Sequence, residues 1–491
     1  MSFETPPRPR WLLRVSLALG TVLVLVLGVV AVVGFVQRCG TDVWHAGDDR
    51  ECVGVTDGSF PFSPELADVE GKILAENRKA ADAPQYVTVA VLMPMTAEPD
   101  DSLSTSQIRE YLQGAYIAQQ VANRDAHGLK IQLALANEGR GEHAWDQVTD
   151  QLLDMVDVPG EVDAQANLVA VTGLGVSTTE TVKGVRKLGD AGVPMVGYLS
   201  ADGFNNTSEA FGDPLRNLTR VSPSLANEVA TLTAYLDKTG TRPSRALLVR
   251  DDNDNDYYTG DLRTNFEEQF QAGSADELAV SPYTGGQDPY NLNTKFDRIA
   301  GRLCEDDELN TVLYAGRSNL LPDFVEQISK RTCPKDKEIT VLTGSESTDL
   351  PKPPPNAPTA VSVLYASVSD PAALGHPDNR FQSQYLDFTD ALRQRFGDGV
   401  DESNWTVMGH DVTLTSITAA KLSVEQDDFV PSATDVRDSL MGLNYPRNDV
   451  TGASGRFHLN DSGDRVSGTI PVLRRDKTGH VEVLDLGGLD G

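Results

Sequence analysis

Regular alternation of buried strands and amphipathic helices is the feature that most constrains the fold of this chain. The apolar run Tyr86–Met93 predicts a buried strand, and a polar loop leads from it into a helix over 107–124 with apolar residues on one side. Further strands and helices are predicted in alternation at 131–136, 145–156, 168–172, 178–190 and 193–197. Because no hairpin signals separate these elements, we predict a parallel sheet with helices on both faces.

The same α/β pattern restarts after residue 222. A helix over 225–239, a strand over 246–250 and further strand–helix pairs up to residue 346 predict a second lobe, with a cleft between the two. In open parallel sheets, ligands bind beyond the carboxyl ends of the strands. Ser177, Thr178, Ser200 and the loop after Met93 all lie at such ends.

The segment Ala170–Glu180 has the features of an anion-binding turn. A predicted strand ends in Gly173 and Gly175, and the hydroxyl residues Ser177 and Thr178 then open a helix. The free N–H groups at a helix N-terminus, together with such hydroxyls, attract a carboxylate or another anion. Since Ser and Thr are also ordinary N-cap residues, a purely structural turn is the alternative interpretation.

The net charge of the chain excludes two classes of binding partner. The 491-residue chain has a formal net charge of −30. Nucleic acids and anionic membrane surfaces repel such a chain, so neither is an expected partner. The length suffices for two or three domains with sizeable cores.

An uncharged segment near the N-terminus predicts a membrane anchor. Residues 15–36 are long enough to span a bilayer, and Arg8, Arg10 and Arg14 precede them. We therefore expect a cytoplasmic tail over 1–14, one transmembrane helix over 15–36 that acts as a signal-anchor, and a spacer over 37–84. The rest would lie outside the cell membrane; a cleavable signal peptide is the alternative.

The four cysteines fall into two local pairs on the side predicted to be exported. Cys39 pairs with Cys52 and Cys304 with Cys333 in the expected disulfides. Metal binding is the alternative, but neither a CxxC spacing nor neighbouring histidines support it.

Other chemistry has weaker support in the sequence. Asp252, Asp254 and Asp256 resemble the start of a calcium loop, yet the glycine and the final acid of such a loop are missing. His410 and Asp411 suggest acid–base work, although an aspartate near a predicted helix start is more often a cap. No nucleophile elbow, phosphate loop or zinc-protease motif occurs. We expect a protein that is not an enzyme and has no cofactor and no metal.

Many short matches in a fixed order indicate a family. They are the strand into Pro94-Met95-Thr96, the turn Gly173–Ser177, Val193-Pro194 leading to Ser200, Arg220 with Pro223-Ser224, Asp256 with Tyr258, Gly316, Gly344-Ser345-Glu346, Gly409-His410-Asp411, and Gly455, Phe457 and Gly463-Asp464. Over residues 85–485 the chain resembles type I periplasmic (solute) binding proteins, in particular those for branched-chain amino acids (Leu/Ile/Val).

The resemblance implies an α/β fold of two lobes with parallel sheets flanked by helices, joined by three crossings that allow hinge closure on a ligand. One lobe would comprise 85–222 plus 367–450, and the other 223–366 plus 451–491. The implied ligand-binding residues are Met95, Thr96, Ser177, Thr178, Ser200 and Ala201 from the first lobe, and Tyr258 and Glu346 from the second.

Three departures from the family pattern concern the contacts to an amine. Thr259 follows Tyr258 where glycine is usual. Asn137-Glu138 replaces the usual acidic residues after the second strand, and Ala201-Asp202 replaces a hydroxyl residue.

Two functions fit these observations. The first is a membrane-tethered extracytoplasmic solute-binding protein that delivers a small polar ligand, such as an amino acid, to an ABC importer and its permease. The second is an extracytoplasmic ligand sensor or interaction module of the same fold without a transport role.

Overall fold

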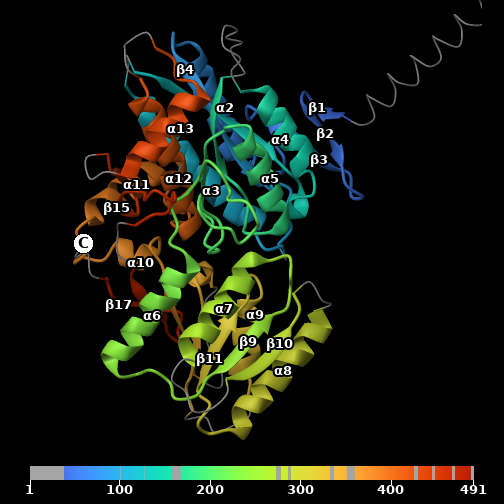
Figure 1. Ribbon diagram of the computed structural model, residues 1–491, viewed down its shortest axis with the longest axis vertical. Helices are drawn as coiled ribbons and strands as arrows, with labels where there is room; N and C mark the ends of the chain where they lie inside the picture. The colour runs from blue at the N-terminus through green and yellow to red at the C-terminus, as the bar shows by residue number, and fades with distance from the viewer. Residues whose placement is uncertain are drawn as a thin grey trace, which may run out of the picture.

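Two α/β lobes make up the part of the chain that the computed structural model describes, namely residues 38–99, 101–125, 128–156, 167–271, 278–285, 289–331, 337–350, 360–424, 429–444, 448–466 and 470–487. Figure 1 shows the lobes one above the other, with the first lobe at the top. The predicted α/β class and the two-lobed arrangement are confirmed.

Lobe 1 is built on an eight-stranded sheet in the order β1-β2-β3-β5-β4-β6-β7-β8. Strands β5, β4, β6 and β7 pair in parallel, as predicted, because helices connect them in sequence, and β8 joins the parallel set after a fully described loop without a helix. Strands β1 to β3 form an antiparallel edge. The bounds are β1 (Arg38–Gly40), β2 (Val43–Ala46), β3 (Glu51–Thr56), β4 (Tyr86–Met93), β5 (Lys130–Asn137), β6 (Leu168–Gly173), β7 (Met195–Gly197) and β8 (Leu218–Arg220).

The strand β4 shows why both faces of this sheet need helices. Val89 and Val91 are buried on one face, while Ala90 and Leu92 are buried on the other. The helices on the first face are α2 (Ala67–Ala81), α3 (Thr105–Ala122), α11 (Gln382–Phe396), α12 (Asn404–Leu422) and α13 (Ala433–Met441); those on the second are α4 (Trp145–Asp154) and α5 (Thr179–Asp190).

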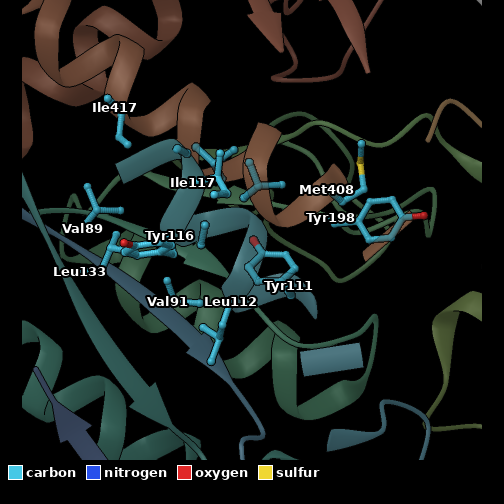
Figure 2. Packing of buried hydrophobic residues seen from close by; sticks show 14 of the residues in the cluster. Val89, Val91, Tyr111, Leu112, Tyr116, Ile117, Leu133, Tyr198, Met408 and Ile417 are labelled. Atoms are coloured by element: carbon cyan, nitrogen blue, oxygen red, sulfur yellow. The ribbon is translucent and has the colours of Figure 1, made fainter. Parts of the chain in front are cut away.

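Close packing of α3 against α12 organises the first face. Figure 2 shows Tyr111 and Ile117 of α3 between the strand residues and Met408 of α12. Glycine makes this approach possible, because a Cβ atom on Gly409 would collide with the backbone oxygen of Tyr111. Gly114 meets the backbone of α12 in the same way.

The predicted spacer over 37–84 is wrong. Strand β3 pairs antiparallel with β5, and its Val53 is fully buried. Helix α2 buries Val69 and Ile73 in the core of lobe 1. These side chains are removed from water by the sheet, so the segment is part of the lobe rather than a linker. The strands were missed because they are short and lie at an antiparallel edge.

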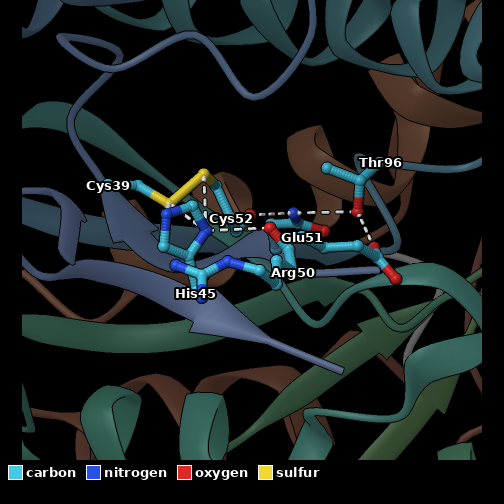
Figure 3. Close-up of a disulfide and its surroundings, with 7 residues drawn as sticks. Cys39, His45, Arg50, Glu51, Cys52 and Thr96 are labelled. Carbon is cyan, nitrogen blue, oxygen red and sulfur yellow. Dashed lines mark hydrogen bonds between the residues drawn. A yellow bond between two sulfur atoms is a disulfide. The ribbon is translucent and has the colours of Figure 1, made fainter. Parts of the chain in front are cut away.

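A disulfide joins Cys39 of β1 to Cys52 of β3, with 5.9 Å between their Cα atoms, which confirms the first predicted pair. Figure 3 shows His45 against this bond; its Nδ1 lies 3.3 Å from the Cys39 sulfur and 2.8 Å from the carbonyl oxygen of Arg50. Cys304 is also disulfide-bonded. Cys333, its predicted partner, lies outside the described residues.

Lobe 2 contains a seven-stranded sheet in the order β10-β9-β11-β12-β13-β16-β17, antiparallel only at β16 and β17. Its strands are β9 (Leu247–Asp251), β10 (Ala279–Tyr283), β11 (Thr311–Ala315), β12 (Ile339–Leu342), β13 (Val361–Ala366), β16 (Val472–Arg475) and β17 (Val481–Asp485). One face carries α6 (Leu225–Thr239) and α7 (Tyr257–Gln271), and the other α8 (Pro289–Glu305) and α9 (Leu321–Ser329). The short helix α10 (Pro371–Leu374) lies near β17.

The boundary predicted at residue 451 needs correction. Strands β14 (Val450–Gly452) and β15 (Gly455–Phe457) pack on lobe 1, and Phe457 and Leu459 are buried in its core. Asp411 of α12 fixes the turn between these strands, accepting from the N–H groups of Ala453 at 2.7 Å and Ser454 at 2.8 Å. Asp411 therefore lies in the interior of α12 as an anchor rather than at the helix start. The chain stays in lobe 1 through residue 466.

Among the described residues, no helix is both long enough and apolar enough to cross a membrane. The transmembrane helix predicted for 15–36 and the tail over 1–14 lie outside the described residues.

Candidate functional site

The carboxyl-terminal edges of the two parallel sheets meet between the lobes. Ser177 follows β6 in lobe 1, and Tyr258 lies in the first turn of α7 in lobe 2. The edges touch directly: the N–H of Tyr257 donates to the carbonyl of Ser177 at 2.9 Å, and that of Thr179 donates to the carbonyl of Asn255 at 3.1 Å. The structure thus brings these predicted site residues together, with the lobes closed.

The N-terminus of α5 is occupied by a carboxyl group of the protein itself, that of Glu142. Thr178 is the N-cap, and its hydroxyl accepts from the N–H of Thr181 at 3.2 Å. The Glu142 carboxylate receives hydrogen bonds from the Thr178 hydroxyl, the Thr181 hydroxyl at 2.9 Å and the N–H of Val176 at 3.1 Å. Burial raises the pKa of Glu142, while these hydrogen bonds and the charge of Arg317 act against the rise. Glu142 fills the place predicted for a ligand carboxylate.

Glu138 lies beside Glu142 and is 3% exposed. The two carboxyl groups approach each other at Gly175, where any Cβ atom would collide with the Glu142 carboxylate. Gly175 also has a φ of +60°, which a side chain rarely adopts. Burial and the neighbouring Glu142 raise the pKa of Glu138 well above its usual range. Each of the two buried carboxyl groups therefore disfavours the ionised form of the other.

The facing edge of lobe 2 holds a cation that also belongs to the protein. Arg317 follows β11 and is 3% exposed. Its Nε and Nη2 atoms donate to the two Asp256 oxygens at 2.7 and 2.9 Å, and its Nη1 donates to Glu346. The guanidinium lies 4.6 Å from the centre of the Tyr258 ring. Glu346 and Tyr258, predicted to meet a ligand, meet Arg317 instead.

Charge pairing explains how this triad tolerates burial. Burial alone would lower the pKa of Arg317, but the carboxylates of Asp256 and Glu346 raise it, so the guanidinium stays charged. Burial raises the pKa of Glu346, and Arg317 counteracts the rise. Asp256 is the third acid of the suggested calcium loop. The other two, Asp252 and Asp254, are exposed, so the three acids do not converge on a cation.

A further carboxyl group reaches the same edge from α6. Glu228 is fully buried and accepts from the N–H of Ser345 at 3.0 Å and from its hydroxyl at 2.8 Å. Burial raises the pKa of Glu228 to about 8, against the effect of the two Ser345 hydrogen bonds.

Ser200 and Ala201 support the first crossing between the lobes through their backbone. The Ser200 carbonyl accepts from the N–H of Leu225 at 2.8 Å, and the Ala201 carbonyl accepts from Nη1 of Arg220 at 2.7 Å. Both residues are buried. A ligand contact from them stays a prediction.

Met95 and Thr96 are tied to lobe 1. The N–H of Met95 donates to Oδ1 of Asn137 at 2.7 Å, and its side chain is fully buried. The Thr96 hydroxyl donates to Glu51 (Figure 3). Both contacts hold the loop after β4 in place, so the ligand contacts predicted for these residues also stay predictions.

An open cavity of about 770 Å³ lies between the lobes at the side of this filled centre. Lobe 1 contributes the N-terminal turns of α3 and α12, and lobe 2 the loop before α9 and the β16–β17 hairpin. Asn404 of α12 is fully buried, and its Oδ1 has no hydrogen-bond partner among the described residues. Polar residues lining the cavity include Ser104, Gln107, Glu110, Ser318, Asn319, Asp370, Ser403, Asn404 and Arg475.

Sequence reasoning missed both the cavity and the two internal charges. Glu142 lies in the short 3-10 helix Arg140–Glu142, which has no periodicity, and Arg317 follows a strand that was predicted correctly. A signal did exist for each. Glu138 comes directly after a buried strand, with Glu142 in the turn that follows, and Arg317 is a lone cation at a strand end.

Among groups of histidine, cysteine, aspartate and glutamate in the described ranges, the one arranged closely enough to hold a metal is Cys39, His45 and Cys52. Its two cysteines form the disulfide, so their sulfurs are not available as thiolate ligands.

Solved structures share this fold. No family model and no curated protein matches the chain. An ABC transporter substrate-binding protein from Desulfitobacterium hafniense in complex with leucine has a TM-score of 0.57 and 15% identity, covering 82% of this chain and 100% of its own. A leucine-binding protein from Thermotoga maritima has a TM-score of 0.59 and 15% identity, covering 82% and 99%.

A solute-binding protein of an ABC transporter from Rhodopseudomonas palustris BisB5, in complex with 3,4-dihydroxybenzoic acid, has a TM-score of 0.58 and 14% identity, covering 83% of this chain and 99% of its own. At these identities the similarity establishes the fold. The chain therefore has the two-lobed type I fold found in periplasmic binding proteins for leucine and for aromatic acids.

Proposed function

We propose that this chain is a membrane-tethered extracytoplasmic binding protein that captures a small polar solute between its lobes for an ABC importer. The N-terminal tail would be cytoplasmic, the apolar segment would cross the cell membrane once, and both lobes would lie outside. The role is binding, without a catalytic step.

The cavity of about 770 Å³ carries this proposal. Its volume is in the range of sites for small ligands, and both lobes line it, as expected where hinge closure and ligand binding are linked. The lining is partly polar and includes Ser104 and Ser318, as in sites where a few polar groups orient a small solute.

One observation favours the second candidate, a sensor or interaction module without a transport role. The lobes are joined by direct backbone hydrogen bonds between Ser177 and Tyr257 and between Thr179 and Asn255. A protein that is already closed does not need solute to bring its lobes together, and solute-driven closure is what commonly links such binding to transport.

Native mass spectrometry of the full chain, purified in detergent without added solute, tests solute binding. We expect a mass increment from a retained small molecule. Thermal-shift assays with leucine, benzoate and 3,4-dihydroxybenzoate then compare the wild type with Ser318→Trp, which fills the cavity.

Ser383→Trp is the matched control, since Ser383 is exposed on α11 and outside the cavity lining. Loss of the mass increment in Ser318→Trp but not in Ser383→Trp supports the cavity as the site. Retention in both variants would contradict it.

A further inference from the structure

We propose that Glu142 and Arg317 are built-in occupants of the anion and cation positions at the centre of the cleft. They exclude a free amino acid from the centre, while hydrogen bonds between the facing edges of the lobes let the lobes stay closed without a solute. This inference goes beyond the proposed function, and it stands whether or not the flanking cavity binds a solute.

The anion position is occupied by a carboxyl group from lobe 1. A helix N-terminus with two threonine hydroxyls is a site for a carboxylate. Here the Glu142 carboxylate accepts hydrogen bonds from the Thr178 and Thr181 hydroxyls and from the N–H of Val176. The N–H of Thr179 is bonded across the cleft to the carbonyl of Asn255. An entering carboxylate would have to displace a buried carboxyl group from its donors.

The cation position is saturated from within lobe 2. An acid next to an aromatic face is a site for an ammonium or guanidinium group. Arg317 makes a bidentate pair with Asp256, a further bond to Glu346 and a cation–π contact with Tyr258. An entering ammonium group would have to displace Arg317 and leave a guanidinium without partners in a dry site.

The facing edges of the two lobes are also hydrogen-bonded to each other. Besides the two backbone bonds between 177–179 and 255–257, Asp202 of lobe 1 contacts α7 of lobe 2. Its N–H donates to Asp261 at 2.7 Å, and its carboxylate accepts from Asn265 at 2.7 Å. The closed arrangement therefore has its own hydrogen bonds and requires no bridging solute.

Distance measurements between spin labels in the full chain test this proposal. Labels on Ser383→Cys in α11 and Thr264→Cys in α7 report the separation of the lobes, because both positions are exposed and lie on different lobes. We expect one short distance in the protein without solute, unchanged by L-leucine at about 1 mM.

Arg317→Ala in the same labelled chain leaves Asp256 and Glu346 facing Glu142 without the guanidinium between them, so it should give a longer or broader distance. Methylguanidinium should restore the short distance. The matched control Arg474→Ala removes an exposed lobe-2 ion pair with Glu482 and should leave the distance unchanged. A wild-type distance that shortens with L-leucine, or an Arg317→Ala distance equal to that of the wild type, would overturn the proposal.

If Arg317→Ala does not fold, calorimetry on the wild type still decides. Absence of binding heat with L-leucine supports the proposal, and a Kd below about 1 mM that persists when Ser318→Trp fills the flanking cavity overturns it. If a solute is retained in the flanking cavity while the lobes stay closed throughout, the present proposal is intact. Failure of the present proposal and failure of solute binding are therefore distinguishable.

Discussion

The two lobes satisfy the buried groups at their facing edges in opposite ways. Lobe 1 surrounds one carboxyl group, Glu142, with neutral donors from the turn and helix that follow β6. Lobe 2 places one cation, Arg317, between the carboxylates of Asp256 and Glu346. A carboxyl group that accepts from several neutral donors can lose one of them at a moderate cost in stability. A buried ion triad that loses its central cation leaves two negative charges facing each other. Lobe 2 should therefore be the more fragile half of the cleft.

The lobes differ in their helix layers as well. In lobe 1, α3 and α12 approach so closely that glycine backbone touches backbone at Gly114 and Gly409. In lobe 2, a Cβ atom on Gly301 of α8 would meet nothing within 4 Å. The glycines at the contact between α3 and α12 in lobe 1 therefore admit no side chain, whereas Gly301 at the surface of α8 in lobe 2 does.

The largest effect should come from Arg317→Ala. Removing the cation leaves Asp256 and Glu346 buried without their partner, which costs about 3–5 kcal/mol in the free energy of unfolding. Arg474→Ala should cost at most about 1 kcal/mol, because that ion pair is on the surface. Urea unfolding of both variants measures the difference, and equal losses would contradict the fragility of lobe 2.

Gly409→Ala should be next in size. The added methyl group collides with the Tyr111 backbone, which cannot rotate away, so we expect a loss of about 3 kcal/mol. Gly301→Ala, in open space within a helix, should stabilise the protein by about 0.5–1 kcal/mol. Thermal unfolding of the pair gives the comparison, and a neutral Gly409→Ala would mean that α3 and α12 can separate without cost.

Thr178→Ala should cost about 2 kcal/mol, because α5 loses its N-cap and Glu142 loses a donor. Ser224→Ala removes only the N-cap of α6 in lobe 2, where the Ser224 hydroxyl accepts from Asn227 at 3.2 Å, and should cost about 1 kcal/mol. Chemical denaturation of the two variants isolates the contribution of Glu142. A Ser224→Ala loss as large as that of Thr178→Ala would show that the extra donor contributes nothing.

Glu228 should produce the smallest effect, seen only as a dependence on pH. Its folded pKa of about 8 lies above the unfolded value, so the folded state holds the proton more tightly. The stability that this proton contributes is complete below the unfolded pKa and is lost as pH rises toward about 8. From about pH 6 to pH 7 the wild type should lose about 1 kcal/mol more than Glu228→Gln. If the free energy of unfolding depends on pH in the same way for both proteins, the pKa of Glu228 is not raised in the folded state.

Local patterns predicted much of the first lobe correctly, because strands, turns and caps depend on neighbouring residues. The strand over 168–172, the glycine turn and the hydroxyl cap Thr178 all occur as expected, since apolar alternation and capping are short-range effects. The occupants of the cleft could not be predicted in this way. Glu142 meets Thr178 across 36 positions of sequence, and Arg317 meets Asp256 across 61.

The antiparallel edge was missed for a related physical reason. Strands of three to six residues such as β1, β2 and β3 carry too few alternations to stand out from a loop. Their assignment comes from the pairing of β3 with β5, in which Val55 lies opposite Ala136, 81 positions later in the sequence. Residues in such an edge look like a linker until their partner strand is known.

The Cys39–Cys52 bond has a mechanical consequence. It joins the first described strand directly to β3, which is hydrogen-bonded to β5 in the main sheet. Tension applied to the chain ahead of Arg38 would therefore pass through a covalent bond into the sheet, instead of peeling β1 and β2 away one hydrogen bond at a time. The disulfide therefore makes the start of lobe 1 a firm mechanical connection to the main sheet.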